Sequence, residues 1–198
     1  MRLRCGGFVP CTGAEGPHLR FAVWVQGCAL ACPGCCNKEL WSPAGGHAIA
    51  IDTLVGAVLS ARGAYGIEGI TIIGGEPLEQ TDAVAALARA VSDHGLGVVV
   101  FTGFTLEEAR ARPGFAALWS ATDTLVEGRY EARQRDDVRR FVGSTNQRLV
   151  HRTHRYAEPA LWHGEKTAEL VRGGDGRLRI VGDPAVARTL SRALEASR

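Results

Sequence analysis

Long apolar runs, a strong net charge and internal repeats are all missing from this sequence of 198 residues. No window reaches the ~18 to 20 apolar residues that cross a membrane, so we expect no membrane partner. The formal charge of +2 is too small to imply a nucleic acid partner. The first residues also lack the apolar core of a signal peptide, which favours a cytoplasmic location.

The composition that is present is an ordinary globular balance, with 45% hydrophobic and 22% charged residues. This length predicts a single domain over residues 1–198. Apolar segments typical of buried strands alternate with helical segments, which favours an α/β fold with a parallel sheet. We expect strands at residues 20–25, 69–73, 97–101 and 124–126, a helix at 81–94, a capping box of Thr105 and Glu108, and a helix capped by Asp52 with Leu54, Val55, Val58 and Leu59 on its apolar face.

The last third of the chain has a different character. Residues 129–156 are polar and aperiodic, so we expect mostly loop there, and their many arginines allow a local anionic ligand. Residues 165–198 form a predicted C-terminal extension. Its expected elements are a hairpin of residues 167–172 and 177–181 around a turn at 173–176, and a helix from Asp183-Pro184 with Val186, Leu190 and Leu194 facing inward.

Three cysteines follow the first predicted strand. Cys28, Cys32 and Cys35 have the spacing C-x3-C-x2-C. In a reducing compartment clustered cysteines indicate metal ligands before disulfides. Three thiolates in one loop can bind three irons of a cubane cluster and leave the fourth iron open to a ligand. The alternative, a zinc site, is disfavoured because the nearest histidines, His18 and His47, lack zinc-ligand spacing.

A second group of residues follows the next strand. Gly74, Gly75, Glu76 and Pro77 come at the carboxyl end of a predicted parallel strand, where α/β sheets place ligand sites. Alone, this segment is typical of an ordinary strand-to-helix turn, but beside a cysteine loop it indicates a ligand site. Thr102, Glu127 and Arg148 are three further candidate ligand contacts. Each also has a structural alternative, which is to end a strand for Thr102, to be a solvated loop carboxylate for Glu127 and to lie on the surface for Arg148.

These motifs together resemble the radical S-adenosylmethionine superfamily. Gln26-Gly27-Cys28, Cys32-Pro33-Gly34-Cys35 and Asn37 are similar to the activating proteins of anaerobic ribonucleotide reductase and related glycyl-radical enzyme activases, which carry a single 4Fe–4S cluster. Residues 125–129 and 143–148 also match stretches found in that group. The resemblance covers about residues 21–150, within a predicted core of residues 20–150.

The resemblance implies an incomplete (β/α) barrel, since ~200 residues cannot close the ~250 of an eight-stranded barrel. It implies that Cys28, Cys32 and Cys35 hold the cluster and that residues 74–77 receive the amino group of S-adenosylmethionine. One electron from the cluster then yields methionine and a 5′-deoxyadenosyl radical. Thr102, Glu127 and Arg148 are the other implied contacts of this cofactor; no catalytic residue is assigned.

The remaining cysteines depart from this pattern. Cys36 stands where the resembling activases carry an aromatic residue, and we expect that it is not a cluster ligand. We expect Cys5 and Cys11 to be ordinary thiols; the alternative is a second metal site that also uses Cys36.

Three functions stay open at this point. The first is an activase that forms a glycyl radical on a partner enzyme, with a flavodoxin or ferredoxin as reductant. The second is a radical enzyme that modifies a small molecule or a peptide. The third is a non-catalytic electron carrier or sensor.

Overall fold

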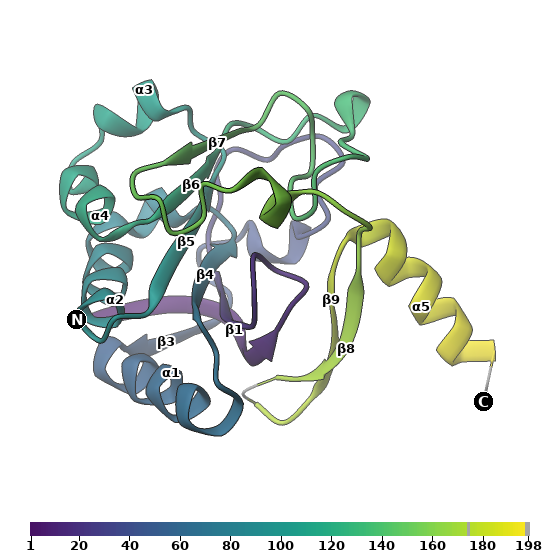
Figure 1. Cartoon of the computed structure of the whole chain (residues 1–198), viewed down its shortest axis with the longest axis horizontal. Helices are drawn as coiled ribbons and strands as arrows, with labels where there is room; N and C mark the ends of the chain where they lie inside the picture. The colour runs from purple at the N-terminus through teal and green to yellow at the C-terminus, as the bar shows by residue number, and fades with distance from the viewer. Residues whose placement is uncertain (174, 197–198) are drawn as a thin grey trace.

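The computed structural model describes residues 1–173 and 175–196. Its main sheet has seven strands in the order β3-β1-β2-β4-β5-β6-β7 (Figure 1). Within the described residues the sheet does not close on itself, because β3 and β7 are its edges. The four parallel strands are β2 (Arg20–Val25), β4 (Gly69–Gly74), β5 (Gly97–Thr102) and β6 (Thr124–Glu127), and the three antiparallel additions are β1 (Arg2–Thr12), β3 (His47–Ala50) and β7 (Arg148–His151).

Helices cover one face of this sheet. Figure 1 shows α1, α2 and α4 together on that side, whereas β8, β9 and α5 lie on the other. None of the described helices is long and apolar enough to cross a membrane. The α-helices are α1 (Ile51–Tyr65), α2 (Thr81–Asp93), α3 (Leu106–Arg110), α4 (Phe115–Ala121) and α5 (Pro184–Ala196), and the 3-10 turns are η1 (Lys38–Leu40), η2 (Pro77–Gln80), η3 (Ala132–Gln134) and η4 (Pro159–Trp162).

The alternation of side chains along each strand divides the core between the two faces. On β2, Val23 packs in the large cluster formed with the helices, whereas the neighbouring Trp24 packs with Val9, Val171 and Val181 on the opposite face. The second face is therefore covered by segments that follow the parallel strands in sequence, including the C-terminal hairpin.

The hairpin consists of β8 (Ala168–Arg172) and β9 (Leu178–Gly182), as predicted. Residue 174 of the predicted turn lies outside the described residues, as do residues 197–198 of the predicted extension. Glu169 on β8 accepts hydrogen bonds from the Thr12 hydroxyl at 2.6 Å and from the Gly13 N–H at 3.2 Å. These bonds fasten the C-terminal segment to the end of β1.

The four predicted parallel strands, the helix that becomes α2 and the capping box of Thr105 and Glu108 are confirmed. The predicted cap of α1 is wrong: β3 runs directly into the helix, so Ala50 is the N-cap and Asp52 lies in the first turn. There its carboxylate still faces the positive end of the helix dipole.

Three further differences concern the ends of the chain and the arginine-rich region. The sequence did not indicate β1 or β3. Residues 129–156 are mostly loop, but they contain β7, which pairs antiparallel with β6. Leu194 is 40% exposed, because α5 extends beyond the hairpin that it packs against, whereas Val186 and Leu190 are half-buried.

Candidate active site

The cysteine loop begins where β2 ends, and backbone hydrogen bonds hold its base. Gly27 has φ +98°, a conformation that favours glycine. The N–H of Cys28 donates to the Trp41 carbonyl at 3.0 Å, and the N–H of Cys35 donates to the Cys32 carbonyl at 3.1 Å. The loop is therefore closed at its base and turns tightly between its second and third cysteines.

Two N–H groups lie around the cysteine loop without an oxygen acceptor in the described part of the chain. Asn37 donates its N–H to Cys35 Sγ at 3.4 Å, and Trp41 Nε1 is buried with no partner among the described residues. Burial raises the pKa of the Cys28 thiol, which favours the neutral thiol over the thiolate, so a bound metal ion would have to displace this proton. No group of three His, Cys, Asp or Glu in the described chain converges on a single ion. A cubane cluster fits this arrangement, since each thiolate binds a different iron.

Gly74 and Gly75, where β4 ends, lie in close contact with the end of β2 and the base of the cysteine loop. Gly75 donates its N–H to the Val25 carbonyl at 2.8 Å. A Cβ at Gly75 would lie 2.3 Å from the Gly27 carbonyl oxygen, and one at Gly74 would lie 2.7 Å from Trp24 Cα. Only glycine leaves room for this approach, so the sequence motif and the cysteine loop form one unit.

Glu76 joins the ends of two neighbouring strands. It is buried, and it accepts hydrogen bonds from the N–H of Leu78, the Thr102 hydroxyl and the N–H of Gly103, each at 2.8 Å. Burial raises the pKa of this carboxyl. Glu76 and Thr102 line the cavity described below, whereas Pro77 opens η2 outside the lining.

Glu127 and Arg148 form an ion pair across β6 and β7, where they are register partners. Glu127 is buried and also accepts from the N–H of Leu106 at 2.5 Å, and Arg148 reaches Glu107 at 3.1 Å. Neither residue lines the cavity. The structure therefore brings these two predicted contacts together but away from the cysteines.

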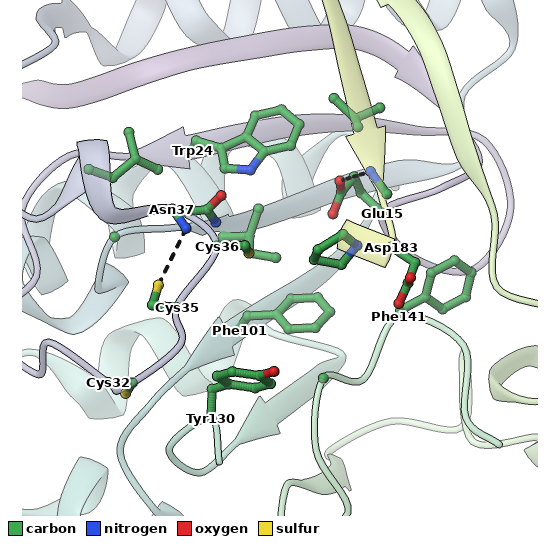
Figure 2. A pocket seen from close by; sticks show the side chains of 18 of the residues that line it. Glu15, Trp24, Cys32, Cys35, Cys36, Asn37, Phe101, Tyr130, Phe141 and Asp183 are labelled. Atoms are coloured by element: carbon green, nitrogen blue, oxygen red, sulfur yellow. Dashed lines mark hydrogen bonds between the residues drawn. The ribbon is translucent and has the colours of Figure 1, made fainter. Parts of the chain in front are cut away.

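A cavity of about 700 Å³ extends from the cysteine loop to the C-terminal segment. Figure 2 shows Cys32 and Cys35 at one end, the rings of Phe101 and Tyr130 along it, and Phe141 and Asp183 at the other end. Most of the wall could not be predicted from the sequence, because its residues come singly from distant segments. These additional lining residues include Glu15, Trp24, Phe101, Tyr130, Arg140, Phe141, Lys166, Arg179 and Arg188.

Glu15 is a titratable group of the cavity wall that no sequence motif indicated. It lies in the loop after β1, and it accepts a hydrogen bond from the N–H of Gly182 at 2.7 Å. Burial, opposed by this hydrogen bond and assisted by the charge of Glu169, raises the pKa of Glu15 to about 7. The wall of the cavity therefore contains a carboxyl group that titrates near neutral pH.

The three other cysteines have different positions. Cys36 lines the cavity and is exposed to solvent. Cys5 is buried within β1, where burial raises the pKa of its thiol to about 12, and Cys11 is half-buried on the same strand. In the described part of the chain these three do not gather as a metal site. That Cys5 and Cys11 are ordinary thiols stays a prediction.

Comparison with known proteins defines the class to which this site belongs. Residues 14–150 match the family described as a 4Fe-4S single cluster domain, and the chain belongs to that family. It is an enzyme of the radical S-adenosylmethionine type, with a 4Fe–4S cluster and S-adenosylmethionine as cofactors. The alternative of a non-catalytic electron carrier or sensor is therefore set aside.

Within this class the chain is similar to activating proteins. It is 26% identical over 144 residues to the anaerobic ribonucleoside-triphosphate reductase-activating protein of Enterobacteria phage T4, which covers 71% of this chain and 88% of that protein. The protein of the same name from Vibrio cholerae is 29% identical over 152 residues, covering 73% and 95%.

Two further matches are partial. The pyruvate formate-lyase 1-activating enzyme of Escherichia coli K12 is 29% identical over 152 residues, and the match spans 74% of this chain but 59% of that enzyme. The crystal structure of QueE from Escherichia coli is similar with a TM-score of 0.46 and 14% identity, covering 67% of this chain and 73% of that one.

Proposed function

We propose that this enzyme activates a partner enzyme by forming a glycyl radical on it. The observation that carries the proposal is the contact of Gly75 with Gly27, which joins the cysteine loop and the end of β4 in the wall of one cavity. The activating proteins among its relatives support the same function.

In this proposal Cys28, Cys32 and Cys35 hold the cluster, and the backbone at Gly74 and Gly75 accepts the amino group of S-adenosylmethionine. When bound, these cofactors supply a 5′-deoxyadenosyl radical that abstracts a hydrogen atom. The side chains of the protein orient the two reactants and exclude water.

Glu76, Pro77, Thr102, Glu127 and Arg148 are the other proposed contacts of the cofactor, and each also has a positioning role. Glu76 and Thr102 hold the ends of β4 and β5 in place through their hydrogen bond, and Pro77 begins the turn that follows. Glu127 and Arg148 brace the loop that leads to Gly128, which lines the cavity. We propose these as positioning roles.

The access of the partner, the reductant and the location are further parts of this proposal. An incomplete barrel leaves a lateral opening through which a glycine-bearing segment of a partner enters. The proposed reductant is a flavodoxin or ferredoxin, and the proposed location is the cytoplasm, where thiols stay reduced.

Anaerobic reconstitution with iron and sulfide, followed by reduction, tests the first half of this proposal. We expect 5′-deoxyadenosine and methionine to form from S-adenosylmethionine, and no product would contradict it. For the second half, the chain is co-expressed with a glycyl-radical enzyme encoded beside it. We expect the electron paramagnetic resonance doublet of a glycyl radical, and no signal with any such neighbour would argue against an activase.

A second function, modification of a small molecule or a peptide, is favoured by one observation. The C-terminal segment contributes Lys166, Arg179, Asp183 and Arg188 to the cavity wall, so this chain itself supplies charged groups that could contact a small ligand. Absence of a glycyl-radical enzyme gene in the genomic neighbourhood would favour this alternative.

A further inference from the structure

Cys28 is held from outside the cysteine loop, through the backbone on both sides of it. Its N–H donates to the Trp41 carbonyl at 3.0 Å. The preceding carbonyl, that of Gly27, accepts an N–H of the segment that follows β4 at 2.7 Å. By contrast, the N–H of Cys35 donates to the carbonyl of Cys32, which belongs to the same loop. The first cysteine is therefore the point at which the loop is fastened to the rest of the protein.

Two side chains continue this fastening where the backbone pairing of β2 with β4 ends. They belong to Glu79 and Gln80, the last two residues of η2. Glu79 Oε1 accepts from the N–H of Ala29 at 2.5 Å, directly after Cys28. Gln80 Nε2 donates to the Gln26 carbonyl at 2.9 Å, two residues before Cys28. The turn after β4 therefore binds the chain on both sides of the first cysteine.

Gln80 also contacts the first strand, so its role in the fold is clear. Its Oε1 accepts from the N–H of Arg4 at 2.8 Å, and its Nε2 donates to the Arg4 carbonyl at 2.9 Å. The side chain is half-buried, and these bonds use both the donor and the acceptor of the amide. Gln80 therefore joins the end of η2 to β1 and to the end of β2, whatever the cysteine loop binds.

Glu79 differs, because its carboxylate contacts the base of the cysteine loop and not the core of the fold. Besides the bond of Oε1 to Ala29, its Oε2 lies beside Gly27, where an added Cβ would be 3.5 Å from this oxygen. The side chain is exposed, and within the described residues it forms no ion pair. A negative charge that no cation of the described chain balances therefore lies beside the first cysteine.

We propose that Glu79 is a positioning residue for Cys28 and that its charge makes the bound cluster harder to reduce. The bond to the Ala29 N–H fixes the backbone from which the Cys28 side chain leaves, as groups that orient metal ligands generally do. A negative charge near an iron–sulfur cluster disfavours an added electron, because net charge is one of the properties that set its potential. This inference rests on the proposed function, since it takes Cys28 as a cluster ligand.

The first experiment measures how fast the reconstituted holoenzyme loses iron to a chelator under anaerobic conditions. E79A removes the acceptor of the Ala29 N–H, so we expect iron loss to be about tenfold faster. E79Q keeps an oxygen that can accept this N–H, so its rate should lie close to that of the unmodified chain. The matched control is E158Q, at an exposed glutamate before η4, which should change nothing. Iron loss by E79A at the unmodified rate would overturn the proposal.

The second experiment separates the charge of Glu79 from its hydrogen bond. The midpoint potential of the cluster is measured by a redox titration followed by electron paramagnetic resonance. We expect E79Q to be easier to reduce, with a ratio of reduced to oxidised cluster about threefold higher at a fixed potential. The difference should shrink as salt is added, because Glu79 is exposed. A potential in E79Q equal to that of E158Q and of the unmodified chain would overturn the proposal.

A third variant, C28A, distinguishes a failure of this inference from a failure of the proposed function. Its iron content is measured after anaerobic reconstitution, and we expect most of the iron to be lost because one corner of the cluster has no ligand. Iron loss in C28A together with unchanged behaviour of E79A and E79Q would overturn this inference alone. Full iron in C28A would overturn both, because Cys28 would then not be a ligand.

Discussion

At the cysteine end of the cavity backbone groups meet backbone groups, whereas at the far end charged side chains meet charged side chains. Gly75 approaches the Gly27 carbonyl so closely that no side chain fits between them. At the far end Arg135 and Lys166 share Asp183, and Arg140 has no acidic partner within the described residues. The first end thus depends on shape and the second on charge.

This difference indicates which properties each end can change without loss of the fold. A backbone contact tolerates almost no substitution, because any added atom moves the strands themselves. A half-buried charge such as Arg135, 35% exposed, tolerates exchange at modest cost, whereas Lys166 and Asp183 are almost covered and tolerate it less. The cofactor end is therefore the fixed part of the molecule, and the far end is the part where specificity can vary.

The largest expected effect comes from the cysteines. C35A should lose most of its iron and all cleavage of S-adenosylmethionine, because one corner of the cluster loses its ligand. C36A should keep its iron, since Cys36 lines the cavity without a proposed role in ligation. Iron content and visible absorption after anaerobic reconstitution measure both. Equal iron loss in the two variants would show that Cys36 is also a ligand.

The next effect tests the shape of the cysteine end. G75A should destabilise the protein by about 3 kcal/mol, because the new Cβ forces the Gly27 carbonyl to move. G63A is the matched control: Gly63 lies in α1 with nothing within 4 Å of its Cβ position, so it should stabilise by about 0.5–1 kcal/mol. Urea unfolding measures both, and a neutral G75A would contradict the close approach.

A smaller effect tests whether the C-terminal hairpin opens independently of the parallel strands at the cysteine end of the cavity. E169A removes the hydrogen bonds from Thr12 and Gly13, which should accelerate amide exchange in β8 and β9 about tenfold and leave β5 unchanged. Hydrogen exchange followed by mass spectrometry measures this. E165A, an exposed change just before the hairpin, is the control. Faster exchange across β5 as well would mean that the two ends open as one unit.

The smallest effect concerns pH. The pKa of Glu15 is raised from 4.5 to about 7, so the folded state favours the neutral acid. Its stabilising contribution is complete below pH 4.5 and is lost as the pH rises through about 7. E15Q keeps an acceptor for the Gly182 N–H and cannot ionise, so its stability should depend less on pH in this window. Chemical unfolding at pH 5 and pH 8 measures this, with E158Q as control. An unchanged pH dependence in E15Q would contradict the shift.

The fold was predictable where its signals are local. The parallel strands are short apolar segments between glycines and helices, and these were found. β1 was missed because Gly6, Gly7 and Pro10 disfavour a regular strand. The structure accommodates them with register shifts between Cys5 and Gly7 and between Val9 and Thr12. Pairing with β2 and β3 fixes this strand, and pairing is not visible in a single segment.

The site, like the fold, was predictable only where its signals are local in the sequence. The cysteine spacing and the Gly-Gly-Glu-Pro segment are contiguous motifs, and the structure places them together. The far end is assembled from single residues, such as Glu15, Arg140 and Arg188, that no spacing connects. Glu127 and Arg148 form an ion pair across β6 and β7, which the sequence did not indicate, and their contact with the cofactor stays a prediction.

The hydrogen bond between Thr12 and Glu169, which holds the hairpin against β1, also has a consequence for the order of folding. Thr12 and Glu169 are 157 residues apart in sequence, so their contact forms only after nearly the whole chain has been synthesised. Long loops close late, because their closure entropy must be offset by structure already formed. Until then the residues that the C-terminal segment contributes to the cavity, such as Lys166 and Asp183, are not part of its wall.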